Sequence, residues 1–149
     1  MNATPKIVLD TNVVLDIFVF FNPALQAVAS ALEQRQLQWI GTSHTMAELG
    51  HVLHHARLGG RQIDAEHVLT LAFALIRLID VPEPLALNRW RCTDASDQKF
   101  IDLALSTGAR WLLTRDRAVL KLARKVAPSG LVIQVPERWA PAALPRPAP

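Results

Sequence analysis

A chain of 149 residues, half of them hydrophobic, is long enough for one folded domain with a real core and too apolar to be disordered throughout. Its net charge of +3 and its pI of about 9.6 favour polyanionic partners such as nucleic acid without requiring them. The single cysteine, Cys92, excludes an intramolecular disulfide, and no stretch reaches the roughly 20 apolar residues of a membrane span. We therefore expect a cytoplasmic protein with no membrane partner.

Hydrophobic periodicity, helix caps and chain breakers predict that strands and helices alternate along the chain. Pro23 suits the first turn of one helix, and Ser43 and Asp64 can cap two more. In chain order we expect a strand over 6–10, a helix over 24–35, a strand over 37–42, helices over 44–58 and 64–78, a loop around Trp90, a helix over 97–107, a strand over 111–114, a helix over 117–126 and a strand over 131–135.

This alternation is typical of an α/β domain whose mostly parallel sheet is covered by helices on both faces. We assign residues 1–135 to that domain. Residues 136–149 include five prolines among 14, which excludes a regular helix or a central strand there. We expect this proline-rich tail to be extended or mobile on the surface. Trp39 and Trp111 fall in predicted strands and should lie in the core.

Four acidic residues lie near predicted strand ends or in the neighbouring helices. Asp10 ends the first strand and Asp116 lies just past a later one, while Glu48 and Asp97 belong to helices. Ligands of open parallel sheets bind beyond the carboxyl ends of the strands, so these carboxylates can converge at one edge. Crowded carboxylates suit Mg²⁺ or Mn²⁺, which can activate water and stabilise a pentavalent phosphate. The pattern therefore favours a metal-dependent nuclease.

Each acid also has a purely structural interpretation, which is the more common one for a single residue. Asp10 can cap a turn, Asp94 and Asp97 have the spacing of a capping box, Asp116 can cap its helix, and Glu48 can lie on a solvated face. The functional interpretation depends on the joint placement of the acids and on Asp10 ending an otherwise apolar strand.

Four ordered motifs resemble those of PIN-domain nucleases. They are residues 8–13 (VLDTNV), residues 46–49 (MAEL) with Val52 and Leu53, residues 94–101 (DASDQKFI), and residues 104–116 with Gly108-Ala109 and the ending LLTRD. The resemblance runs from about residue 7 to residue 126. Within the family, the chain is most similar to the toxin components of bacterial toxin–antitoxin pairs.

The resemblance implies a three-layer α/β/α sandwich and an endoribonuclease that needs Mg²⁺ or Mn²⁺. It also implies a homodimer restrained by a small antitoxin protein. The residues that it carries over as catalytic metal ligands are Asp10, Glu48, Asp97 and Asp116, with Asp94 as an additional ligand. Thr11, Asn12 and Thr114 are implied to orient the carboxylates. Asp16 and Asp102 are left outside the site; Asp102 follows Asp97 by five residues, on a different face of the helix.

Two further sets of side chains leave alternatives open. His44, Glu48, His51 and His55 share one helical face, which would suit a zinc protein using His51, His55 and Glu48. A polar or dimer-facing stripe is the more common explanation.

Basic residues flank the acids. Arg115 and Arg117 flank Asp116, and Arg91 and Lys99 flank Asp94 and Asp97; these four could bind RNA phosphates or form a solvated face. Trp90 could stack on a base. A catalytically silent PIN-like module that binds RNA or protein is therefore a second hypothesis.

Overall fold

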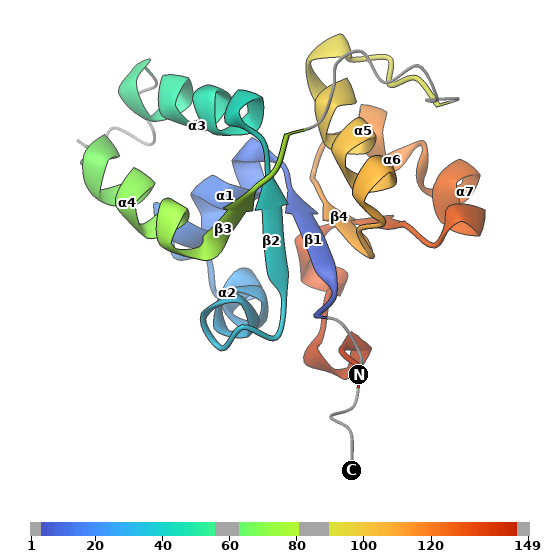
Figure 1. Ribbon diagram of the computed structural model, residues 1–149, viewed down its shortest axis with the longest axis horizontal. Coiled ribbons are helices and arrows are strands. Elements are labelled where there is room, and N and C mark those ends of the chain that lie inside the picture. The colour runs from blue at the N-terminus through green and yellow to red at the C-terminus, as the bar shows by residue number, and fades with distance from the viewer. Residues whose placement is uncertain (1–3, 56–62, 81–89, 146–149) are drawn as a thin grey trace.

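The computed structural model describes residues 4–55, 63–80 and 90–145 (Figure 1). The five strands form one parallel sheet in the order β3-β2-β1-β4-β5, which confirms the expected α/β class. The strands are β1 (Lys6–Leu9), β2 (Gln38–Gly41), β3 (Ile76–Leu78), β4 (Trp111–Leu113) and β5 (Val132–Gln134). The end of the helix expected over 44–58, and residues 81–89 before Trp90, lie outside the described residues.

Helices cover both faces of the sheet and make the three layers of the expected sandwich (Figure 1). One face carries α1 (Thr11–Phe18), α2 (Gln26–Glu33), α3 (Ser43–His55) and α4 (Ala65–Leu75), and the other carries α5 (Gln98–Thr107), α6 (Arg117–Leu120) and α7 (Ala123–Val126). Because side chains alternate along a strand, Ile7 and Leu9 join the first core and Val8 joins the second. Trp39 and Trp111 are buried, as expected.

Three elements differ from the sequence-based prediction. The helix expected over 117–126 is divided in two: α6 ends at Leu120 and α7 begins at Ala123. Residues Thr11–Phe18, for which we expected no element, form α1, which the Asp10 side chain caps by accepting a hydrogen bond from Val13 N at 3.0 Å. The helix expected to reach residue 78 ends at Leu75, and Ile76–Leu78 form β3 at the edge of the sheet. Pairing with β2 satisfies the backbone of this apolar segment, and such a tertiary contact overrides helix periodicity.

The described part of the proline-rich segment packs on the body of the protein instead of extending into solvent. The Trp139 side chain is 4% exposed, and its ring meets the ring of Trp111 edge to face at 5.8 Å between centroids. Two short 3₁₀ turns, Pro136–Arg138 and Pro141–Ala143, suit a sequence that cannot form a long helix. Residues 136–145 therefore contribute to the first core, and residues 146–149 lie outside the described part.

Among the described residues, none of the single helices combines the length and the apolar character needed to cross a membrane. The bent helix pair Thr11–Phe18 and Pro23–Glu33, taken together, has the length and the apolar composition of a membrane span, and only these two properties indicate one.

Candidate active site

The site lies where the order of the strands reverses. From β1 the chain goes outward through β2 and β3, then returns to the other side of β1 for β4 and β5. Asp10 directly follows β1, and Asp116 follows β4 by three residues; Leu9 and Leu113 at the two strand ends are register partners. Ligands of open parallel sheets bind in the crevice at such a switch point. The topology alone therefore brings Asp10 and Asp116 to one place.

A cavity of about 310 Å³ opens at this point, and all four predicted acids line it. Asp10 and Asp116 come from the strand ends, Glu48 from α3 and Asp97 from the turn before α5. Thr11, Asn12 and His51 also line the cavity. Residues far apart in the sequence thus meet in one acidic site, as their joint placement predicted.

Asp10 is the most buried of the four acids, with 5% of its surface exposed. Its Oδ1 accepts the Val13 N–H, and its Oδ2 accepts the hydroxyl proton of Thr114. Burial raises the pKa of Asp10 above its usual value, although the Thr114 hydrogen bond opposes this shift. Asp10 therefore fulfils the capping role and lines the cavity as well; the two interpretations do not exclude each other.

Asp94, Asp97 and Asp116 form a group whose carboxylate oxygens lie within 4.8 Å of one another. Burial, then the neighbouring carboxyl groups of Asp116, Asp94 and Asp10, raise the pKa of Asp97 to about 7. No donor among the described residues reaches Asp97 Oδ2, although this oxygen is buried. Buried acceptors without a donor are rare, and a cation is one way to satisfy them. This donor set fits a hard divalent ion.

The capping box considered for Asp94 and Asp97 does not form. Asp94 instead caps the short 3₁₀ turn Ala95–Asp97, where its Oδ1 accepts hydrogen bonds from Ser96 N at 3.0 Å and Ser96 Oγ at 2.6 Å. These bonds lower the pKa of this exposed carboxyl. The Asp97 side chain makes no capping bond at the start of α5 and remains available to the cavity.

Glu48 has partners on both carboxylate oxygens. Its Oε2 accepts the Thr11 hydroxyl, and its Oε1 accepts Lys99 Nζ at 2.7 Å. Only 11% of the Lys99 side chain is exposed, so Lys99 is held against Glu48 instead of standing on an open basic surface. We expected Lys99 to meet RNA, and nothing in the sequence signalled this pairing across 51 residues.

The predicted orienting residues lie beside the acids. Thr11 contacts Glu48, and Thr114 donates to Asp10 while accepting the Asp116 N–H at 3.0 Å. Asn12 lines the cavity. The two acids left outside behave differently: Asp16 pairs with Arg115, and Asp102 accepts the Gln98 side-chain amide at 2.8 Å.

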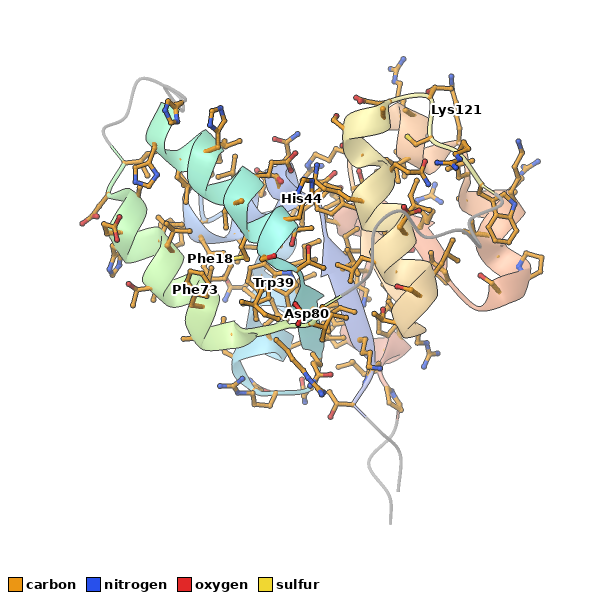
Figure 2. The ribbon with its side chains drawn as sticks, turned by 45° about the horizontal axis from the view of Figure 1, so that its top comes forward. Phe18, Trp39, His44, Phe73, Asp80 and Lys121 are labelled. Carbon is orange, nitrogen blue, oxygen red and sulfur yellow. The ribbon has the colours of Figure 1, made fainter. Side chains whose placement is uncertain are left out.

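The other predicted RNA-binding residues fall into two groups. Arg115 is held by Asp16, at 3.0 Å from Arg115 Nε, and by Glu137 of the proline-rich segment. Arg117 and Arg91 are exposed. Arg91 lines a second cavity of about 340 Å³ with His44, Lys99 and Asp102; Figure 2 shows His44 at the start of α3, on the side that faces α5. Trp90 is partly buried against the second core.

The histidine stripe does not assemble a zinc site among the described residues. His51 lines the acidic cavity, and its ring stacks on His55 at 4.3 Å. The one group of three possible ligand side chains that the described part of the chain brings together is the aspartate group, and Glu48 is paired with Lys99 instead of a histidine. The structure therefore gives the zinc hypothesis no support.

Comparison with known proteins agrees with this geometry. Residues 6–118 match the PIN domain family, so the chain belongs to the PIN domain family, whose members are in general nucleases. No curated protein sequence gives a match.

Two solved structures share the fold. One is VapBC2 from Rickettsia felis bound to a DNA fragment from its promoter, with a TM-score of 0.58 and 16% identity over 86% of this chain and 96% of that chain. The other is PAE2754 from Pyrobaculum aerophilum, with a TM-score of 0.54 and 20% identity over 87% of this chain and 90% of that chain.

Proposed function

We propose that this PIN-domain protein is an endoribonuclease that needs Mg²⁺ or Mn²⁺ and is the toxin component of a toxin–antitoxin pair. The observation that carries the proposal is the cavity at the β1–β4 switch point, which all four motif acids line. A buried oxygen of Asp97 without a donor supports the need for a cation.

The chain's own groups define what each part of the cavity does. Asp97 and Asp116, with Asp94 beside them, would hold the divalent ion, and Asp10 adds a further carboxylate close to them. When bound, such an ion lowers the pKa of water and neutralises charge on a phosphate. Thr114 fixes the orientation of Asp10, and Thr11 fixes that of Glu48. Without a cation, the carboxylates would repel an RNA phosphate.

The RNA would approach along the exposed basic residues beside the cavity. Arg117 lies next to Asp116, and Arg91 lies in the neighbouring cavity with His44. Guanidinium groups bind phosphates, and His51 can contact the chain at the rim. Arg115 contributes less to this surface, since Asp16 and Glu137 already neutralise it.

A protein partner is consistent with the apolar surface of the first helical layer. A groove of about 460 Å³ between α1, α2 and α4 is lined mainly by apolar side chains, among them Phe18, Phe21 and Leu71, and also by three polar ones, Asn22, Gln26 and Glu33. Phe21 at this groove is 71% exposed and Phe73 of α4, labelled in Figure 2, is 51% exposed, and exposed apolar surface often marks an interface. An antitoxin and a second copy of the chain are the partners we propose, in the cytoplasm.

A cleavage assay tests the proposal. The purified chain should cut a labelled single-stranded RNA with Mg²⁺ or Mn²⁺ and stop with EDTA. Asp97→Asn should abolish cleavage, whereas Asp64→Asn should cut normally, because Asp64 only caps α4 and Asn can cap in its place. RNA binding without cleavage by the intact chain in Mn²⁺ would instead support the catalytically silent module.

A further inference from the structure

Glu48 differs from the other acids of the cavity because a cation of the chain itself already compensates its charge. Lys99 Nζ donates to Glu48 Oε1 at 2.7 Å and to the carbonyl oxygen of Ser96, and it lies 5.1 Å from the centre of the Phe100 ring. These three contacts hold a mostly buried ammonium group in one place. Its position is therefore built into the fold.

The aspartates at the same cavity make no ion pair with Lys99, although its charge helps to lower the pKa of Asp94. Oxygens of Asp94, Asp97 and Asp116 lie within 4.8 Å of one another, and no donor among the described residues reaches Asp97 Oδ2. No ion pair joins Asp97 or Asp116 to a basic side chain in the described part of the chain. Lys99 thus compensates Glu48, whereas Asp97 and Asp116 have no basic partner among the described residues.

We infer that Lys99 is a positioning residue that takes the place of a second divalent ion: its ammonium group holds Glu48, so the cavity binds a single divalent ion at the Asp97–Asp116 end. A divalent ion beside Glu48 would have to displace this ammonium or approach it closely, and like charges in a partly buried site repel strongly. The inference rests on the proposed function, because it assumes that the acids bind a metal.

Calorimetric titration of the whole chain with Mn²⁺ measures the number of ions bound. The parent should bind one Mn²⁺ per chain. Lys99→Met, and Lys99→Gln if the first variant folds poorly, should bind two, because Glu48 is then free to act as a ligand. Lys99→Arg keeps the positive charge and should bind one. The double variant Lys99→Met/Glu48→Gln should return to one ion.

Lys6→Met is the matched control, since Lys6 also donates to a backbone carbonyl, that of Thr107, but lies at the opposite end of β1. It should bind one ion, like the parent.

Thermal melts add a second measurement. In EDTA, Lys99→Met should melt below the parent because Glu48 is left uncompensated, and excess Mn²⁺ should raise its melting temperature more than it raises that of the parent.

The outcomes separate the inference from the proposed function. Two ions in the parent, or one ion in both neutral Lys99 variants, would overturn the inference while leaving the metal-dependent nuclease intact. No binding of Mn²⁺ by the parent would overturn the proposed function, and the inference with it.

Discussion

Thr114 donates its hydroxyl proton to Asp10 Oδ2, although the two residues lie 104 positions apart in the chain. The same hydroxyl oxygen accepts the backbone N–H of Asp116 at 3.0 Å. Thr114 is fully buried, so this side chain ties the ends of β1 and β4 together and connects two acids of the cavity.

Replacing Thr114 by Val should therefore harm both stability and the site. Valine fills the same space but leaves the Asp10 carboxylate and the Asp116 N–H without their partner, which should lower the free energy of unfolding by about 1–3 kcal/mol. Thr114→Ser should restore most of this loss. Urea denaturation measures it, with Thr70→Val as control: Thr70 bonds only to the Glu66 carbonyl on an exposed face of α4. Equal effects at both threonines would contradict the role given to Thr114.

The raised pKa of Asp97 predicts how the stability of the metal-free protein depends on pH. In the folded protein the pKa is about 7, against an ordinary value of 3.8, so between these values the native state binds more protons than the unfolded state. Stability should therefore fall as the pH rises through this window and level off above about 7. Melting curves in EDTA for the parent and Asp97→Asn test this, since the variant should show a flatter profile. A parent profile as flat as that of Asp97→Asn would contradict it.

Divalent ions should change the dependence of stability on pH, because they bind the deprotonated carboxylates. We expect the affinity for Mn²⁺ to increase with pH up to about 7 and then to level off. Calorimetric titrations at several pH values measure this. An affinity that stays constant through this range would place the ion away from Asp97.

Asp10→Asn should separate the electrostatic role of Asp10 from its capping role. Asparagine keeps the shape and can still accept the Val13 N–H, so α1 should remain capped. Two carboxylates about 4 Å apart repel by roughly 4 kcal/mol at an effective dielectric of 20, as long as neither is protonated. Removing the charge of Asp10 should therefore reduce the repulsion among the acids of the cavity. In EDTA the variant should melt at the same or a higher temperature than the parent, and Mg²⁺ should stabilise the parent more. A clearly destabilised variant with an unaltered response to Mg²⁺ would leave Asp10 as a cap only.

The two arginines around Asp116 should behave differently towards RNA. Arg117 is exposed and has no ion pair among the described residues, whereas Arg115 is held by Asp16 and Glu137. In an Asp97→Asn background that prevents cleavage, Arg117→Ala should weaken RNA binding and reduce the salt slope by about 1. Arg115→Ala should affect binding less and instead loosen the contact with the proline-rich segment. Filter binding across a salt series compares them; a larger loss for Arg115→Ala would reverse this assignment.

The sequence predicted the parts of the molecule that depend on local pattern and strand order. Asp10 and Asp116 could be placed because parallel strands direct their carboxyl ends to the same edge. β3 could not be predicted, since Ile76–Leu78 continue an apolar helical pattern and become a strand only through pairing with β2. Helix α1 was missed although Asn12 and Asp16 have helical spacing, because Val13, Val14 and Ile17 are β-branched residues that are also common in strands.

Within the site, contacts between side chains distant in sequence were the unpredictable part. Lys99 looks like a surface lysine in the sequence, and only the folded chain brings the start of α5 close enough to α3 for Lys99 to pair with Glu48. Arg115 likewise looks available for RNA until the fold places Asp16 and Glu137 against it. Charge counts along the chain do not reveal such pairs, because pairing depends on tertiary distances.

The position of a bound ion tests the central claim, that the acids at the β1–β4 switch point form one metal centre. Crystals of the chain grown with Mn²⁺ should show an anomalous scattering peak in direct contact with carboxylate oxygens of Asp97 and Asp116, and Asp97→Asn crystals should lack it. A peak bound instead by His51 and His55, or no peak in the acidic cavity at saturating Mn²⁺, would contradict the account.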